Sequence, residues 1–266
     1  MLNPQDPEVD GEMKQGHKKF TSLVRPRGVT SALAVATAAL GLSSCTIPTF
    51  GAFKGATTQG QSTFHLFQGF ALASIAVGGV TFLLLFYVMF RFRKKDESIP
   101  KQTHSNVPIE IMYTVIPIII VVILFFFTVR VENKVVAVSP SPNQRVTVTA
   151  FQWGWKFYYP ATNTTVIASG NTYPQLVLPQ GETTTVTLVS KDVVHGFYIP
   201  AFNFSRYALP GFTNRFDFNP TTTGTFIGRC SQLCGLYHSE MLFSVKVISP
   251  AAFSSWTASQ AGKVTA

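Results

Sequence analysis

An uncharged and mostly apolar stretch at residues 67–90, which reads FQGFALASIAVGGVTFLLLFYVMF, decides how the first half of the chain must fold. A helix needs roughly 20 residues to cross the hydrocarbon core of a bilayer, and this stretch is longer. A second uncharged stretch at residues 111–129, IMYTVIPIIIVVILFFFTV, follows after a short polar connection. The two stretches predict a transmembrane helical hairpin over residues 64–130.

The connection between the stretches, residues 91–106, carries a basic group made up of Arg91, Arg93, Lys94 and Lys95. Short loops rich in Lys and Arg stay on the cytoplasmic side of a membrane. We therefore expect a multi-pass protein of the bacterial plasma membrane, with everything after Arg130 on the extracytoplasmic side.

The composition agrees with a small membrane part beside a folded soluble part. Only 12% of the 266 residues are charged, about half of the roughly 25% usual in soluble proteins. The apolar residues are concentrated in a few segments, which excludes a many-spanning transporter. The net charge of +9 comes from Lys and Arg that flank the apolar runs, so the basic balance reflects membrane topology and not a nucleic-acid partner.

The N-terminal residues 1–45 have the pattern of a secretory signal peptide. A basic flank precedes a short Ala-rich run, and small residues follow it. The sequence Leu42-Ser43-Ser44-Cys45 resembles a bacterial lipobox, which predicts cleavage and lipidation at Cys45; the alternative is a small buried thiol. Residues 46–63 are expected to form an extracytoplasmic linker.

After residue 131, short runs of β-branched and aromatic residues alternate with Pro and Gly, which predicts an all-β domain, a sandwich or barrel, over residues 131–250. The expected strands are residues 145–153, 164–168, 182–190, 215–218, 225–229 and 241–248. The small and polar residues 251–266 are expected to form a surface tail, with Trp256 held by a partner.

The chemistry is concentrated in residues 230–241, CSQLCGLYHSEM. Two thiolates, an imidazole and a thioether form a donor set that favours copper. A mononuclear blue-copper site needs one Cys, so the second suggests two metals bridged by both sulfurs. The missing second histidine is expected to be His195, just past a predicted strand. A disulfide or a Cys2His2 zinc site is the alternative, although neither explains Met241.

These motifs resemble those of subunit II of the haem-copper cytochrome c oxidases, over nearly all of residues 64–250. The resemblance implies a Greek-key cupredoxin domain with a dinuclear CuA centre and no haem in this chain. It also implies partner subunits I and III, with oxygen reduced to water in subunit I. The copper ligands that it implies are Cys230 and Cys234 as bridges, His195 and His238 as caps, and Met241 and the Gln232 carbonyl as weak ligands.

The resemblance also assigns roles outside the cysteine loop. In the aromatic segment QWGWKFYY at residues 152–159, Trp153 would receive electrons from a c-type cytochrome, while Trp155 and Tyr158 would pack around the copper site. The alternative is that these aromatic residues simply fill the core. Glu110, at the cytoplasmic start of the second apolar stretch, would stand at a proton-path entrance, or would only reach toward water.

Two residues depart from the family pattern. Tyr113 stands where Trp is common. Gln232 replaces a frequent Glu whose side chain helps to bind magnesium shared with subunit I, and an amide is a weaker ligand for a hard cation, so that site is doubtful.

The charge of the extracytoplasmic part bears on its electron donor. From residue 131 onward the net charge is +4, which does not suit a basic soluble cytochrome c. We expect a donor that is acidic or tethered to the membrane.

Two other functions share some of these residues. The copper-bearing subunit of a nitric oxide reductase would have the same loop, but Glu110 with its preceding His104 and Asn106 favours the oxidase. A membrane-anchored copper chaperone would use Cys230 and Cys234, yet such proteins usually have helices covering a mixed sheet.

Overall fold

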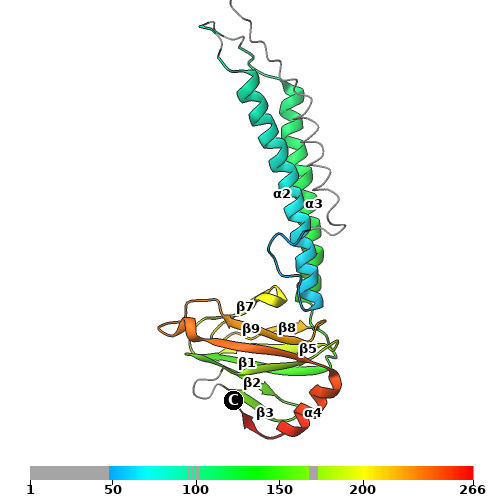
Figure 1. Cartoon of the computed structure of the whole chain (residues 1–266), viewed down its shortest axis with the longest axis vertical. Coiled ribbons are helices and arrows are strands. Elements are labelled where there is room, and N and C mark those ends of the chain that lie inside the picture. The colour runs from blue at the N-terminus through cyan, green and yellow to red at the C-terminus, as the bar shows by residue number, and fades with distance from the viewer. Residues whose placement is uncertain (1–47, 95, 98, 100–101, 168–172, 266) are drawn as a thin grey trace, which may run out of the picture. The chain divides into compact units, whose positions relative to one another are not determined.

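A computed structural model of the chain describes residues 48–94, 96–97, 99, 102–167 and 173–265. The predicted signal peptide and the lipidation site at Cys45 lie outside these residues. Two long helices are followed by two β-sheets and a short C-terminal helix (Figure 1). The prediction of a transmembrane hairpin joined to an all-β cupredoxin-type sandwich is confirmed.

The helices are α2 (Thr58–Arg91) and α3 (Val107–Val136), which lie side by side in Figure 1. Both are long and apolar enough to cross a membrane. The side chain of Thr57 accepts a hydrogen bond from the Gly60 amide, and Asn106 accepts one from Ile109, so each helix begins at a capped residue. Both helices extend past the predicted hairpin limits of 64 and 130, because polar residues continue them beyond the apolar runs.

The β domain consists of two sheets. The six-stranded sheet has the order β11-β3-β2-β1-β5-β8, and the five-stranded sheet has the order β4-β10-β9-β6-β7. The strands of the first sheet are β1 (Gln144–Phe151), β2 (Gly154–Tyr159), β3 (Thr164–Ile167), β5 (Thr184–Ser190), β8 (Asn214–Phe218) and β11 (Val264–Thr265). Those of the second are β4 (Gln175–Pro179), β6 (His195–Ile199), β7 (Phe204–Ala208), β9 (Gly224–Cys230) and β10 (Leu242–Ile248).

Aromatic side chains fill the interior of the domain. Trp155, Phe197 and Phe243 are fully buried or nearly so. The Phe197 and Phe243 rings stack at a centroid distance of 4.8 Å, and Trp155 meets both rings edge-on at 5.3 and 5.2 Å. This cluster lies directly beneath the cysteine loop, because Phe197 follows His195 by two residues and Phe243 follows Met241 by two.

The prediction of a surface tail is wrong for residues 250–260. They form helix α4 (Pro250–Gln260), which begins at a Ser249 cap with Pro250 in its first turn. Phe253 is buried, and the Trp256 ring contacts Tyr159 of the same chain at a centroid distance of 5.1 Å.

Strand pairing brings distant residues of the expected ligand set together. Within the five-stranded sheet, β6 pairs antiparallel with β9 so that Phe197 lies opposite Cys230. His195, two residues before Phe197, therefore reaches the point where β9 ends and the cysteine loop begins.

Candidate metal centre

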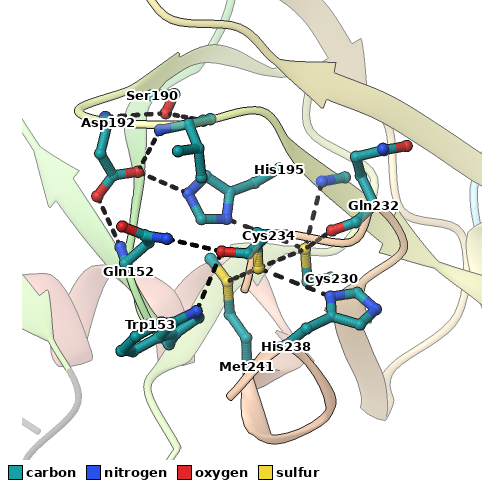
Figure 2. Close-up of polar contacts among 12 residues, drawn as sticks. Gln152, Trp153, Ser190, Asp192, His195, Cys230, Gln232, Cys234, His238 and Met241 are labelled. Atoms are coloured by element: carbon teal, nitrogen blue, oxygen red, sulfur yellow. Dashed lines mark hydrogen bonds and ion pairs between the residues drawn. The ribbon is translucent and has the colours of Figure 1, made fainter. Parts of the chain in front are cut away.

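Six donor atoms from two segments converge at this end of the sandwich (Figure 2). The Cys230 and Cys234 sulfurs lie 3.8 Å apart. Cys230 Sγ lies 4.0 Å from His195 Nδ1 and 3.2 Å from the Gln232 carbonyl oxygen. Cys234 Sγ lies 3.6 Å from His238 Nδ1 and 3.8 Å from Met241 Sδ.

The donors form two groups around the two sulfurs. His195 and the Gln232 carbonyl lie beside Cys230, while His238 and Met241 lie beside Cys234. Each group holds one imidazole and one weak donor. The structure thus brings all six residues of the expected ligand set together.

The alternative of a disulfide does not describe this structure. Sulfur atoms in a disulfide are about 2.05 Å apart, whereas Cys230 and Cys234 are free thiols separated by 3.8 Å. A structural zinc ion takes four ligands, so a zinc site would leave Met241 and the Gln232 carbonyl without a role. Soft sulfur and imidazole donors in this number fit copper.

Water is largely excluded from the centre. Cys230, Cys234 and Met241 are buried, and His195 has no exposed surface. The Gly196 amide lies 3.4 Å from Cys230 Sγ and donates to it. A methyl group at Gly196 would overlap the Ser231 hydroxyl and lie 2.9 Å from the Gln232 amide nitrogen, so only glycine permits this approach.

Asp192 fixes the orientation of His195, a role that was not predicted from the sequence. Its Oδ1 lies 2.8 Å from His195 Nε2, which therefore carries the proton and leaves Nδ1 facing Cys230. Its Oδ2 accepts a 2.7 Å hydrogen bond from the Gln152 amide. A carboxylate three residues before a histidine that is expected to bind metal was the signal available in the sequence.

These contacts shift the pKa values of both Asp192 and His195. Burial alone would raise the pKa of Asp192, but hydrogen bonds from His195 and from the Gln152 and Val193 amides outweigh it, so the pKa falls below its usual value. Burial lowers the pKa of His195, yet its contacts with Cys230 and Asp192 outweigh burial and raise it.

The pKa values of the two thiols shift in opposite directions. Burial raises the pKa of Cys230, but hydrogen bonds from His195 and the Gly196 amide outweigh it and lower the pKa to about 6. Burial, together with the charge of Cys230, raises the pKa of Cys234 to about 12. The metal-free site therefore holds one thiolate near neutral pH.

Trp153 connects the surface to the cysteine loop. Its side chain is 37% exposed, and its Nε1 donates to the Cys234 carbonyl oxygen at 3.2 Å. The Gln152 side-chain amide donates to the same oxygen at 2.7 Å. The Trp153 ring meets Tyr237 edge-on at 5.0 Å, so the indole is held from two sides.

Trp155 and Tyr158 were also expected to pack around the site, but only Trp155 lies there. Trp155 is buried, and its Nε1 donates to the Met241 carbonyl at 3.4 Å. Tyr158 lies on the opposite face of β2, where its hydroxyl contacts Asn163 at 3.2 Å. The expectation for Tyr158 is wrong because side chains alternate between the two faces of a strand.

Glu110 is not part of this centre. It lies in the first turn of α3, where its carboxylate accepts a 2.9 Å hydrogen bond from the Asn106 amide. Its side chain thus helps to cap the helix.

Comparison with known proteins identifies relatives for both parts of the chain. Residues 50–131 match the model for the transmembrane domain of cytochrome c oxidase subunit II, and residues 167–248 match the model for its periplasmic domain. A probable cytochrome c oxidase subunit 2 of Streptomyces avermitilis is 34% identical, with 84% of this chain and 82% of that protein covered. One of Rickettsia bellii is 31% identical over 74% and 78% of the two chains.

A solved structure is also similar. The periplasmic domain of subunit II of cytochrome oxidase from Bradyrhizobium japonicum is 28% identical, and the match covers 46% of this chain and 96% of that domain with a TM-score of 0.42.

Proposed function

Because the chain belongs to the cytochrome c oxidase subunit II family, we propose that His195 and the cysteine loop hold a dinuclear CuA centre, through which the subunit receives electrons. The chain is the membrane-anchored subunit II of a haem-copper oxidase, with its β domain on the extracytoplasmic side. The convergence of six donor atoms on two sulfurs 3.8 Å apart carries the proposal.

Each donor has a part in this proposal. Cys230 and Cys234 would bridge two copper ions, His195 and His238 would cap them, and Met241 and the Gln232 carbonyl would bind weakly. The bound centre would accept and release one electron at a time. Burial of the sulfurs keeps water away, and the Asp192 and Gly196 contacts hold His195 and Cys230 in place before metal arrives.

Trp153 is the proposed entry point for electrons. Its indole is partly exposed and bonds to the carbonyl of Cys234. An electron arriving at the exposed edge would thus cross one hydrogen bond to a residue that bears a copper ligand.

The proposed donor is an acidic or membrane-tethered c-type cytochrome domain, since the part of the chain after residue 131 has a net charge of +4. Oxidase rates with a basic soluble cytochrome c test this at several ionic strengths. A strong fall in rate with added salt would contradict it.

The remaining partners follow from the same proposal. Electrons would pass to the haem-bearing subunit I, with subunit III completing the complex. Glu110 is proposed to stand at a proton-path entrance in addition to its capping contact. A magnesium site through Gln232 is not part of the proposal, because its amide is a weak ligand for a hard cation.

The family models and relatives support the oxidase over the nitric oxide reductase or copper chaperone. Copper titration of the purified chain tests the centre. We expect two copper ions per chain, and fewer in Cys230→Ser. A single copper ion in the unaltered chain would contradict the proposal.

A further inference from the structure

A groove of about 690 Å³ lies between α2 and α3, toward the end where both helices join the β domain. One face of each helix lines it, since the lining positions recur every three to four residues. Gly69 forms part of the α2 wall, and a Cβ atom added there would have open space around it, with nothing within 4 Å.

The groove changes character along its length. Arg130, Lys134 and His65 line it near the β domain, whereas Leu66, Phe70 and Phe127 line it deeper in the membrane. Its α3 wall spans three helical turns, about 16 Å. That length is close to half of the roughly 30 Å hydrocarbon core.

The charged end has no carboxylate counterion among the residues that the structure describes. Arg130 and Lys134 lie one turn apart on the same face of α3. Among the described residues, neither forms an ion pair with a carboxylate. Glu132 does not line the groove, since residues two apart do not share a helix face. The Arg130 guanidinium lies 5.1 Å from the Phe126 ring centroid, which holds it beside the helix.

We propose that this groove binds one anionic phospholipid of the outer leaflet. The phosphate would contact Arg130 and Lys134, and an acyl chain would lie along Leu66, Phe70 and Phe127. A cationic end at the membrane surface above an apolar slot matches a headgroup above its chain. An apolar helix of another subunit would fill the slot but would leave both cations without a counterion. This site is separate from the copper centre and does not depend on it.

Lipid binding to the purified oxidase complex tests the charged end. The complex is washed in neutral detergent, and dioleoylphosphatidylglycerol or dioleoylphosphatidylcholine is then titrated in and counted by native mass spectrometry. We expect the anionic lipid to bind more tightly. The double variant Arg130→Gln with Lys134→Gln should bind it about thirtyfold more weakly, at roughly fivefold per basic residue. Lys54→Gln, a basic residue that does not line the groove, is the matched control.

A second pair of variants tests the apolar slot without changing charge. Gly69→Phe should fill the groove and abolish tight binding. Gly78→Phe adds the same side chain to α2 at another position with open space around it, and should leave binding intact. Both complexes should keep their haem content and assembly.

Two results would overturn the proposal. One is equal binding of the anionic lipid by the unaltered complex, the double variant and Gly69→Phe. The other is cross-linking from a photoreactive benzoylphenylalanine in place of Phe70 to a neighbouring subunit instead of to lipid.

Discussion

Asp192 and His195 are joined by a 2.8 Å contact between Oδ1 and Nε2, which turns Nδ1 of the buried imidazole toward Cys230. The same carboxylate accepts a hydrogen bond from the Gln152 amide through Oδ2. It therefore joins the loop that carries His195 to the turn that carries Trp153. The orientation of a proposed metal ligand and the position of the proposed electron entry thus both depend on the Asp192 side chain.

Replacing Asp192 should weaken copper binding without unfolding the domain. Asp192→Asn keeps the shape of the side chain but cannot accept from both His195 and the Gln152 amide through two oxygens. We expect copper affinity to fall about 10- to 100-fold, the usual cost of losing such a partner. Competition titration with a copper chelator measures this. Glu182→Gln, a partly buried acid elsewhere in the domain, is the control. Unchanged affinity in Asp192→Asn would argue against the positioning role.

Trp153→Phe should slow electron entry while the copper centre remains. Phenylalanine keeps an aromatic ring against Tyr237 but removes the indole N–H that donates to the Cys234 carbonyl. Loss of that hydrogen bond should cost only about 1 kcal/mol of unfolding free energy. Stopped-flow reduction by a c-type cytochrome gives the rate, and the copper absorbance shows whether the centre is intact. An unchanged rate would exclude Trp153 as the entry point.

The two thiols of the metal-free protein should react at different pH. Because the pKa of Cys230 is lowered to about 6 and that of Cys234 is raised to about 12, only Cys230 is largely thiolate at pH 7.5. Iodoacetamide should therefore modify Cys230 first, with a rate that levels off above pH 7. Modification of Cys234 should still increase with pH up to pH 10. Peptide mass spectrometry distinguishes the sites, and equal labelling at pH 7.5 would contradict the assignment.

Glu110 can be tested with two variants that separate its capping contact from its charge. Glu110→Gln keeps an oxygen that can accept from the Asn106 amide, whereas Glu110→Ala removes it. If Glu110 also serves proton entry, both variants should slow proton uptake. Only Glu110→Ala should lower stability, by about 1 kcal/mol. Proton uptake at the normal rate in Glu110→Gln would contradict the role in proton entry, and only the capping role of Glu110 would remain.

The sequence predicted the parts of the fold that depend on local patterns. Apolar length predicted α2 and α3, and alternation predicted strands such as β1, β5 and β10. It did not predict β2, β4, β6, β7 and β11 as strands, because their pairing depends on tertiary contacts that the local pattern does not show. Helix α4 was missed since its composition is small and polar, and its stability comes from packing against Tyr159.

More of the site than of the fold could be predicted from the sequence. The cysteine loop holds most of the donors within twelve residues, so their chemistry could be inferred without tertiary structure. The contribution of His195 depends on the β6–β9 pairing, and that of Asp192 depends on a side-chain orientation. Tyr158 was misplaced because its role was taken from the resemblance, whereas strand alternation places Trp155 and Tyr158 on opposite faces of β2.

The most direct test of the copper proposal is an electron paramagnetic resonance spectrum of the purified chain, produced without partner subunits and loaded with copper. We predict a seven-line hyperfine pattern from one unpaired electron shared equally by two copper nuclei. The pattern should be lost in both Cys230→Ser and Cys234→Ser. A four-line pattern from a single copper ion, or zinc binding with no copper signal, would contradict the proposed electron-entry centre.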